Sequence, residues 1–61
     1  MRKFQIVWQV MEDNQFVEGG IKEIISSSLR LSVQIAEDQI REQFPGAEFQ
    51  MIQVTSEPHN D

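Results

Sequence analysis

The sequence contains no cysteine and no tyrosine, and it has one tryptophan and one histidine. The lack of cysteine excludes disulfides and thiolate metal sites and fits a reducing compartment. No apolar run approaches the roughly 20 residues that a membrane span requires. The segment that follows Met1-Arg2-Lys3 alternates with glutamines and is too polar for a signal peptide. We therefore expect a cytoplasmic protein with no membrane partner.

Positive charge is also scarce, since five lysines and arginines face ten acidic residues, for a net charge of −5. The basic residues are scattered, and no three of them form a patch. Nucleic-acid binding needs a basic footprint that releases counterions from phosphates, so the composition disfavours a nucleic-acid partner. The acidity serves either solubility or docking onto a basic protein surface, and the sequence leaves both interpretations open.

Few residues carry chemistry. His59, the only histidine, lies in residues 56–61, which have no periodicity and are expected to form a disordered tail. The run Ser26-Ser27-Ser28 has no plausible base, and serines before a helix usually cap it. The turn Glu12-Asp13-Asn14 lacks the spaced ligands and distal glutamate of a calcium loop. We therefore expect no enzyme activity, no catalytic residue, no metal site and no cofactor.

The length of 61 residues allows a single domain, which we place at residues 1–55. A chain of this size buries only about 60% of its unfolded surface, so its stability is marginal without help. Disulfides are excluded, which leaves oligomerisation or permanent binding to a larger protein as the source of that help.

The hydrophobic pattern predicts an α+β fold of ββαβ order, a three-stranded antiparallel sheet with one helix packed on one face. Residues 3–11 alternate as in a half-buried strand, and residues 16–25 follow as a second strand after a polar turn. Gly19-Gly20 inside the second strand indicates a bulge or a close backbone approach. A helix from about Ser28 to Phe44 ends before Pro45-Gly46, and residues 47–55 form the third strand.

The first strand and the helix define the expected core. The helix is expected to cover one face of the first strand, with three apolar residues of the second strand beside it. These are Phe4, Ile6, Trp8 and Val10 of the first strand and Val17, Ile21 and Ile25 of the second. Val7 and Met11 then point to the open face of the sheet, while the third strand does not decide which of its faces is buried.

An alternative fold is βαβ, with one long helix from Ile21 to Phe44 and a dimer formed through that helix. Apolar residues keep a rough coiled-coil spacing along this segment. Three consecutive serines in the middle of such a helix argue against it, because they compete for backbone hydrogen bonds.

Two apolar stripes run along the predicted helix. One is the core stripe, formed by Leu29, Val33, Ala36, Ile40 and Phe44. Leu31 and Ile35 point about 200° and 240° away from Leu29 at the helical period, and Asp38 and Glu42 flank them. An apolar pair rimmed by acids is typical of a protein–protein site. The predicted partner interface therefore comprises Leu31, Ile35, Asp38, Glu42, Val7 and Met11.

The layout carries one resemblance. The order strand–turn–strand–helix–strand, with Lys3-Phe4 opening the first strand and Pro45 after the helix, resembles the small phage inhibitors of host RNA polymerase. The resemblance implies that a tiny acidic domain of this shape acts by occluding a large host enzyme, and it transfers no functional residue.

These observations predict a small acidic, non-enzymatic protein-binding domain that acts as an adaptor, regulator or inhibitor of a larger protein. One alternative is a self-assembling subunit, such as a homodimer, whose partner is a second copy of itself. Another alternative is a phage-type inhibitor of a host enzyme such as RNA polymerase. A nucleic-acid mimic is disfavoured because ten acidic residues are too few and too dispersed.

Overall fold

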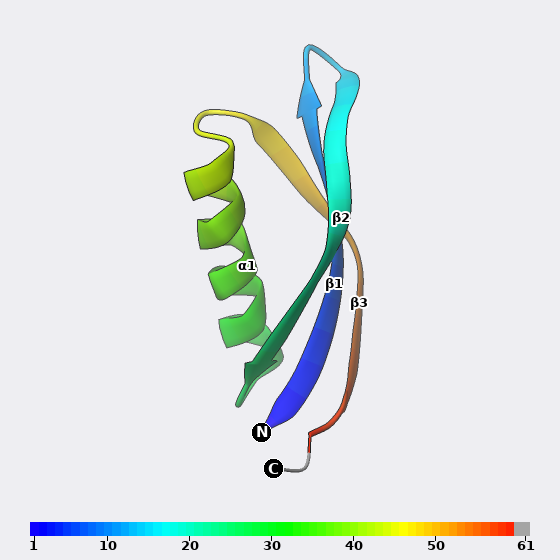
Figure 1. The fold of residues 1–61 in the computed structure, drawn as a ribbon, viewed down its shortest axis with the longest axis vertical. Helices are drawn as coiled ribbons and strands as arrows, with labels where there is room; N and C mark the ends of the chain where they lie inside the picture. The colour runs from blue at the N-terminus through cyan, green and yellow to red at the C-terminus, as the bar shows by residue number, and fades with distance from the viewer. Residues whose placement is uncertain (60–61) are drawn as a thin grey trace.

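A computed structural model describes residues 1–59 of the chain, in which a three-stranded sheet and one helix form two layers (Figure 1). The elements follow in the order β1 (Arg2–Glu12), β2 (Gln15–Ser26), α1 (Leu29–Gln43) and β3 (Glu48–Pro58). The strands form an antiparallel sheet of order β2-β1-β3. The α+β class and the three-stranded antiparallel sheet are confirmed. The alternative with one long helix is wrong, because β2 continues to Ser26.

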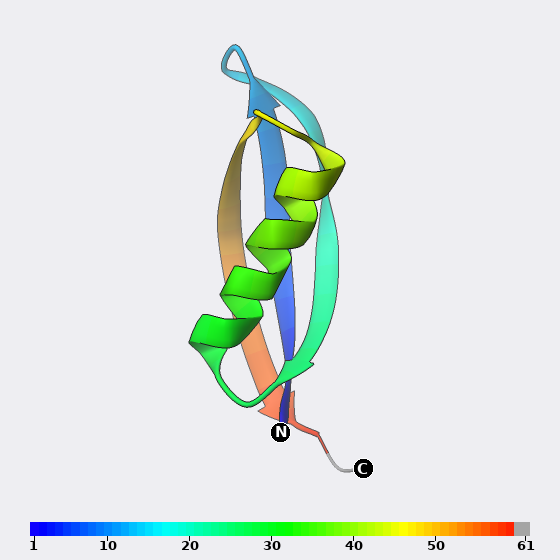
Figure 2. The same ribbon diagram turned by 90° about the vertical axis from the view of Figure 1, so that its left-hand side faces the viewer.

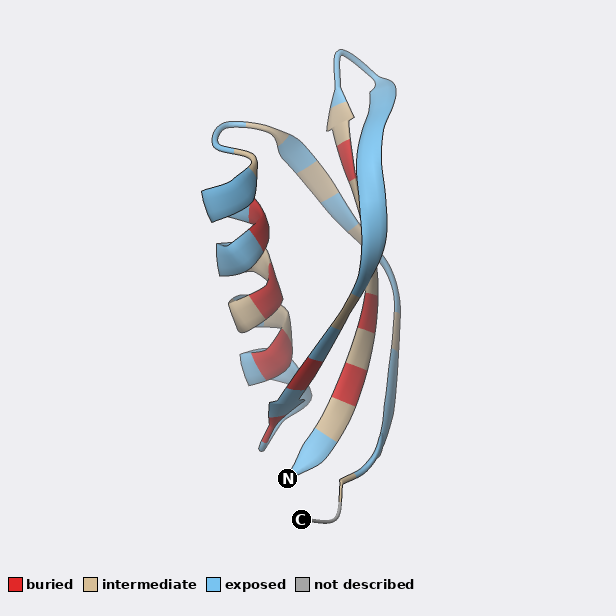
Figure 3. Ribbon diagram, in the orientation of Figure 1, coloured by how far each residue is buried: buried red, intermediate tan, exposed pale blue. Residues whose placement is uncertain are grey.

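The central strand β1 supplies the core, because every second side chain points toward α1. Figure 3 shows this alternation along β1 and the buried stripe of α1 that faces it. The buried side chains form two adjacent clusters. One cluster contains Ile6, Ile24 and Ala36, and the other contains Trp8, Val10 and Ile40. Phe4 is also buried, at the N-terminal end of β1.

The turn between β1 and β2 sets the register of the hairpin. Asp13 and Asn14 both have positive φ, 50° and 62°, as the two central residues of a type I′ turn require. The turn places Glu12 opposite Gln15. The register then shifts by one residue, because Val17 has no partner of its own on β1 and forms a bulge.

The bulge decides which face of β2 is buried. Without it, Ile6 would lie opposite Ile21, but the shift places Lys22 there instead and brings Ile24 opposite Phe4. Ile24 is therefore buried, and Ile21 is exposed. The expectation that Val17, Ile21 and Ile25 lie under the helix is wrong, because a shift of one residue moves every later side chain to the opposite face.

Three serines hold the start of α1 against the sheet. The hydroxyl of Ser28, the N-cap, accepts a hydrogen bond from the backbone N–H of Leu31 at 3.1 Å. Ser26 donates to the carbonyl of Ser28 at 2.8 Å and is also hydrogen-bonded to the hydroxyl of Ser32. Both Ser26 and Ser32 are buried. The predicted capping role of the serine run is confirmed at Ser28.

Removal of the cap has a measurable cost. The substitution Ser28→Ala is expected to lower the free energy of unfolding by about 1 kcal/mol, because the N–H of Leu31 loses its acceptor. Urea unfolding followed by circular dichroism measures the change. Ser27→Ala is the matched control, since Ser27 is exposed and precedes the cap. Equal losses for both variants would contradict a capping role for Ser28.

The helix buries a stripe centred on Ser32, Ala36 and Ile40. Leu29 is 52% exposed, so its predicted place in the core is wrong. It is the first residue of the helix, where the serine cluster rather than an apolar contact fills the space against the sheet. The helix ends at Gln43, and the N–H of Phe44 donates to the carbonyl of Ile40 at 2.8 Å. The predicted stop before Pro45-Gly46 is confirmed.

Strand β3 continues three residues beyond the predicted end, to Pro58. Pairing with the start of β1 orders these residues: Lys3 Nζ lies 2.9 Å from a carboxylate oxygen of Glu57, and Arg2 donates to the hydroxyl of Ser56. The hydrogen bond to Glu57, and then the charges of Glu57 and Glu23, raise the pKa of Lys3 above its usual 10.5. The predicted tail is therefore wrong for residues 56–58, and residues 60–61 lie outside the described part of the chain.

Candidate protein-binding surface

The predicted apolar pair on α1 does not lie together on the surface. Leu31 is 42% exposed, but Ile35 is half-buried and packs against the cluster of Ile6, Ile24 and Ala36. Figure 2 shows that α1 lies along one face of the sheet. The side of the helix that packs on this face is wide enough to include Ile35. One leucine is left exposed where the sequence predicts a stripe.

The acidic residues near this pair have basic neighbours on the same helix. Asp38 is exposed, and one of its oxygens lies 3.4 Å from a guanidinium nitrogen of Arg41. A carboxylate oxygen of Glu37, one turn before Arg41, lies 4.0 Å from the same guanidinium. Glu42 is exposed. The helix surface therefore combines two exposed leucines, Leu29 and Leu31, with charges that are partly neutralised by Arg41. It is a weaker basis for docking than the opposite face of the sheet.

The face of the sheet opposite the helix carries the larger apolar surface. Val7 and Met11 of β1 are half-buried there, as the sequence predicts for an open face. Ile21 lies directly opposite Val7 and is 65% exposed, and Phe16 lies opposite Met11 and is 63% exposed. Ile25 extends the surface toward the start of β1. We name these residues the open-face patch: Val7, Met11, Phe16, Ile21 and Ile25.

The bulge and a glycine hold the aromatic end of this patch flat. A Cβ atom on Gly19 would lie 3.2 Å from the ring of Phe16, so the ring rests over the bare backbone of Gly19. The same Cβ would lie 2.8 Å from the carbonyl oxygen of Trp8. Any side chain at residue 19 would therefore lift the ring and push the two strands apart.

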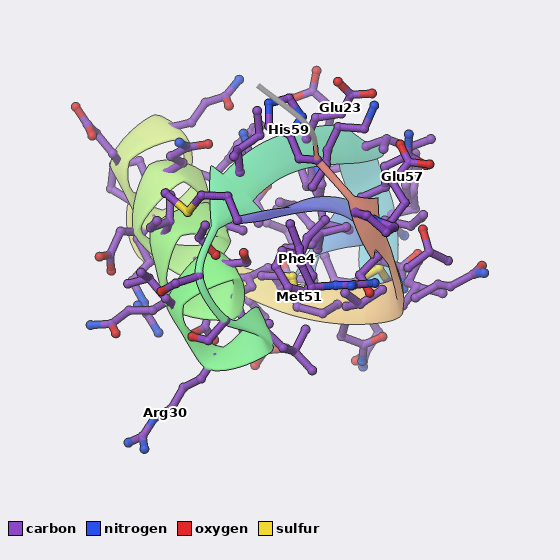
Figure 4. All side chains as sticks on the ribbon, turned by 90° about the horizontal axis from the view of Figure 1, so that it is seen from below. Phe4, Glu23, Arg30, Met51, Glu57 and His59 are labelled. Atoms are coloured by element: carbon purple, nitrogen blue, oxygen red, sulfur yellow. The ribbon has the colours of Figure 1, made fainter. Side chains whose placement is uncertain are left out.

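Polar pairs border the open-face patch and also cross it, because the Gln5–Glu23 row lies between the Val7–Ile21 row and Ile25. Gln9 donates to Gln50 at 3.2 Å on the β3 side, and Gln5 donates to Glu23 at 3.2 Å. Figure 4 shows Glu23 and Glu57 projecting from the outer side of the sheet, while Phe4 and Met51 lie between the sheet and the helix. Exposed apolar side chains interleaved with amides and a carboxylate have the mixed composition of a non-obligate protein interface.

Sequence reasoning found part of this surface. It placed Val7 and Met11 on the open face but assigned Ile21 and Ile25 to the helix side and did not propose Phe16. The Gly19-Gly20 pair signalled a bulge, yet the sequence does not show that the extra residue is Val17, which decides the face of everything after it.

Comparison with known proteins gives no functional lead: no family model, no curated protein and no solved structure matches the chain. Within residues 1–59, no helix is long and apolar enough to cross a membrane. The same residues bring together no group of three or more side chains of the kinds that bind metals.

Proposed function

We propose that this protein is a small non-enzymatic binding domain that docks onto a larger protein through the open-face patch. The observation that carries the proposal is Ile21, which is 65% exposed in the middle of β2 and lies beside Val7. Burying such a side chain against a partner contributes about 1.5–3 kcal/mol. The three predicted helix residues Leu31, Asp38 and Glu42 then lie away from the contact.

The composition of the patch supports this function. Phe16 offers an aromatic ring and Met11 an adaptable thioether chain, and aromatic residues and methionine are enriched in protein interfaces. The Phe16 ring rests over Gly19, so it loses little conformational entropy when a partner binds, while Met11 adjusts to the shape of the partner.

The charge of the rim indicates the chemistry of the partner. Glu23 lies between Ile21 and Ile25, Glu57 lies beside the patch in an ion pair with Lys3, and the net charge of the chain is −5. A partner with an apolar centre and lysines or arginines around it would complement this surface and associate faster through electrostatic steering. An inhibitor that occludes a polymerase is one form of such a domain, and the resemblance to the phage inhibitors stays a prediction.

Substitution on the patch tests the proposal. The double variant Phe16→Glu/Ile21→Glu is expected to lose a partner that the unchanged protein retains from an extract of its source cells. Leu31→Glu is the control, because it adds a carboxylate at an exposed apolar residue of the helix. Quantitative affinity capture compares the three proteins, and titration with the purified partner measures each dissociation constant.

The pattern of loss decides the outcome. Docking through the open face is supported if a protein binds the unchanged chain and Leu31→Glu equally well and binds the double variant with a dissociation constant at least about tenfold higher. Equal retention by all three, or loss with Leu31→Glu alone, contradicts it and moves the contact elsewhere. Circular dichroism of each variant shows whether the sheet is intact.

A further inference from the structure

The outer edge of β2 is open. The sheet order β2-β1-β3 gives β2 one strand neighbour only, and β2 is twelve residues long. Natural proteins usually protect such an edge with charged residues, proline or a covering element. In β2 the stretch from Glu18 to Lys22 has charges only at its two ends, and Gly19, Gly20 and Ile21 between them are all exposed. This stretch is a template for a further strand.

The two charges of the stretch are placed symmetrically about Gly20. Glu18 lies opposite Val10 and Lys22 opposite Ile6, so both point to the same face of the sheet. Four residues along a strand separate them by about 13 Å, which is too far for them to pair with each other. Neither residue forms an ion pair with another residue in the described part of the chain.

A second copy of the same strand, placed antiparallel about a two-fold axis at Gly20, satisfies both charges. Residues at equal distances from the axis then lie opposite each other, so Lys22 of each copy faces Glu18 of the other. Two reciprocal pairs of opposite charge result, and each stabilises the pairing of the strands. A register centred one residue away, at Ile21, would place Glu18 opposite Ile24 instead.

Trp8 places an unpaired hydrogen-bond donor on the same side of the sheet as these two charges. Its indole Nε1 is buried and has no hydrogen-bond partner among the described residues. The edge of the indole that carries Nε1 lies over Gly20, where a Cβ atom on residue 20 would be 3.6 Å from Nε1. The Lys22 ammonium lies 5.4 Å from the ring centroid. In the two-fold pairing, the Glu18 carboxylate of the second copy joins this side of the sheet opposite Lys22, whose ammonium lies over the indole.

We propose that a second copy of this chain pairs antiparallel along β2, about a two-fold axis at Gly20. The two sheets join into one six-stranded sheet with both helices on the same side. The open-face patches, whose Ile21 residues lie next to the axis, merge into one surface. The pairing goes beyond the proposed function and does not depend on it, so a monomeric protein would still dock through a single patch.

A cysteine at the axis tests the pairing directly, because the chain has no other cysteine. Gly20 would face its own copy at a Cα separation of about 4.5–5.5 Å, which is within the range that a disulfide spans. A Cβ atom there makes only ordinary contacts, 3.5 Å or more from Trp8. Gly20→Cys is therefore expected to form covalent dimers under mild oxidation, at least about tenfold faster than Ile52→Cys on β3.

Charge reversal tests the register. In Glu18→Lys and in Lys22→Glu, both pairs become like charges, so each variant is expected to dimerise at least about tenfold more weakly than the unchanged chain. An equimolar mixture of the two variants is expected to form heterodimers, because the two positions are both lysine in one chain and both glutamate in the other. Glu42→Lys and Arg30→Glu serve as controls, because both residues are exposed on the helix. Glu42→Lys changes the net charge by +2, as Glu18→Lys does, and Arg30→Glu changes it by −2, as Lys22→Glu does. Figure 4 shows Arg30 projecting away from the sheet.

Sedimentation velocity over a wide concentration range measures each association. The pairing is supported if dimers form in the mixture of Glu18→Lys and Lys22→Glu and if the two helix controls dimerise as the unchanged chain does. Dimers in the mixture also show that both variants fold, because unfolded chains would not pair. A monomer at every concentration, crosslinking of Gly20→Cys no faster than Ile52→Cys, or equal weakening by the helix controls would each overturn it.

Discussion

Replacement of Ile6 by alanine is expected to lower the free energy of unfolding by about 2–5 kcal/mol. Ile6 is fully buried at the centre of β1, where it contacts Ile24 of β2 and Ala36 of α1. The substitution removes apolar contacts and leaves a cavity between β1, β2 and α1, which the surrounding structure fills only in part. Small domains have a stability near the lower end of about 5–15 kcal/mol, so the variant is expected to be largely unfolded at 37 °C.

Thermal and urea unfolding measure this loss, with Ile52→Ala as the control. Ile52 is on β3 and is 56% exposed, so the same deletion of atoms should change stability by less than about 0.5 kcal/mol. A loss of similar size in both variants would show that the core does not centre on Ile6. Both experiments belong at low protein concentration, where self-association adds little stability.

The adjacent glycines of β2 are expected to respond in opposite directions to alanine. At Gly19 a Cβ atom would lie 2.8 Å from the backbone oxygen of Trp8 and 3.2 Å from the ring of Phe16. The backbone contact is closer than real Cβ atoms tolerate, so the strands must move apart. Gly19→Ala is therefore expected to lower the free energy of unfolding by about 1–3 kcal/mol.

At Gly20 the same change meets only ordinary van der Waals distances, 3.5 Å or more, to the indole of Trp8. Alanine loses less backbone entropy than glycine on folding, so Gly20→Ala is expected to raise stability by up to about 1 kcal/mol. Urea midpoints of the two variants give the comparison. If Gly19→Ala were neutral, the close approach of β1 and β2 at the bulge would be absent.

The sequence correctly predicted those elements whose hydrophobic pattern allows only one face to be buried or whose ends carry clear backbone signals. In β1, Phe4, Ile6, Trp8 and Val10 make one face wholly apolar, whereas Gln5 and Gln9 interrupt the other, and the structure buries the wholly apolar face. The helix ends were equally clear, because serine at the start and Pro45-Gly46 after the end have direct backbone roles.

The candidate surface was harder to predict, because the hydrophobic pattern of its residues allows either face of the element to be buried. Strand β2 carries isoleucine at both parities, Ile24 on one face and Ile21 and Ile25 on the other, so hydrophobicity alone does not choose the face. On α1, Ile35 was assigned to the surface by its angle from Leu29, yet packing against the core cluster leaves it half-buried. An angular pattern fixes relative directions but not how a helix is rotated on its sheet.

The sequence by itself favoured the observed order of the elements over the fold with one long helix, and it determined the buried face of β1 and the ends of α1, because local backbone chemistry and side-chain period decide these. Only the tertiary structure decided the surface that is available to a partner. The single extra residue at Val17 shifts the register of β2, places Ile24 in the core and moves Ile21 and Ile25 to the open face. A bulge has this effect because side chains alternate along a strand, so a shift of one residue exchanges the two faces.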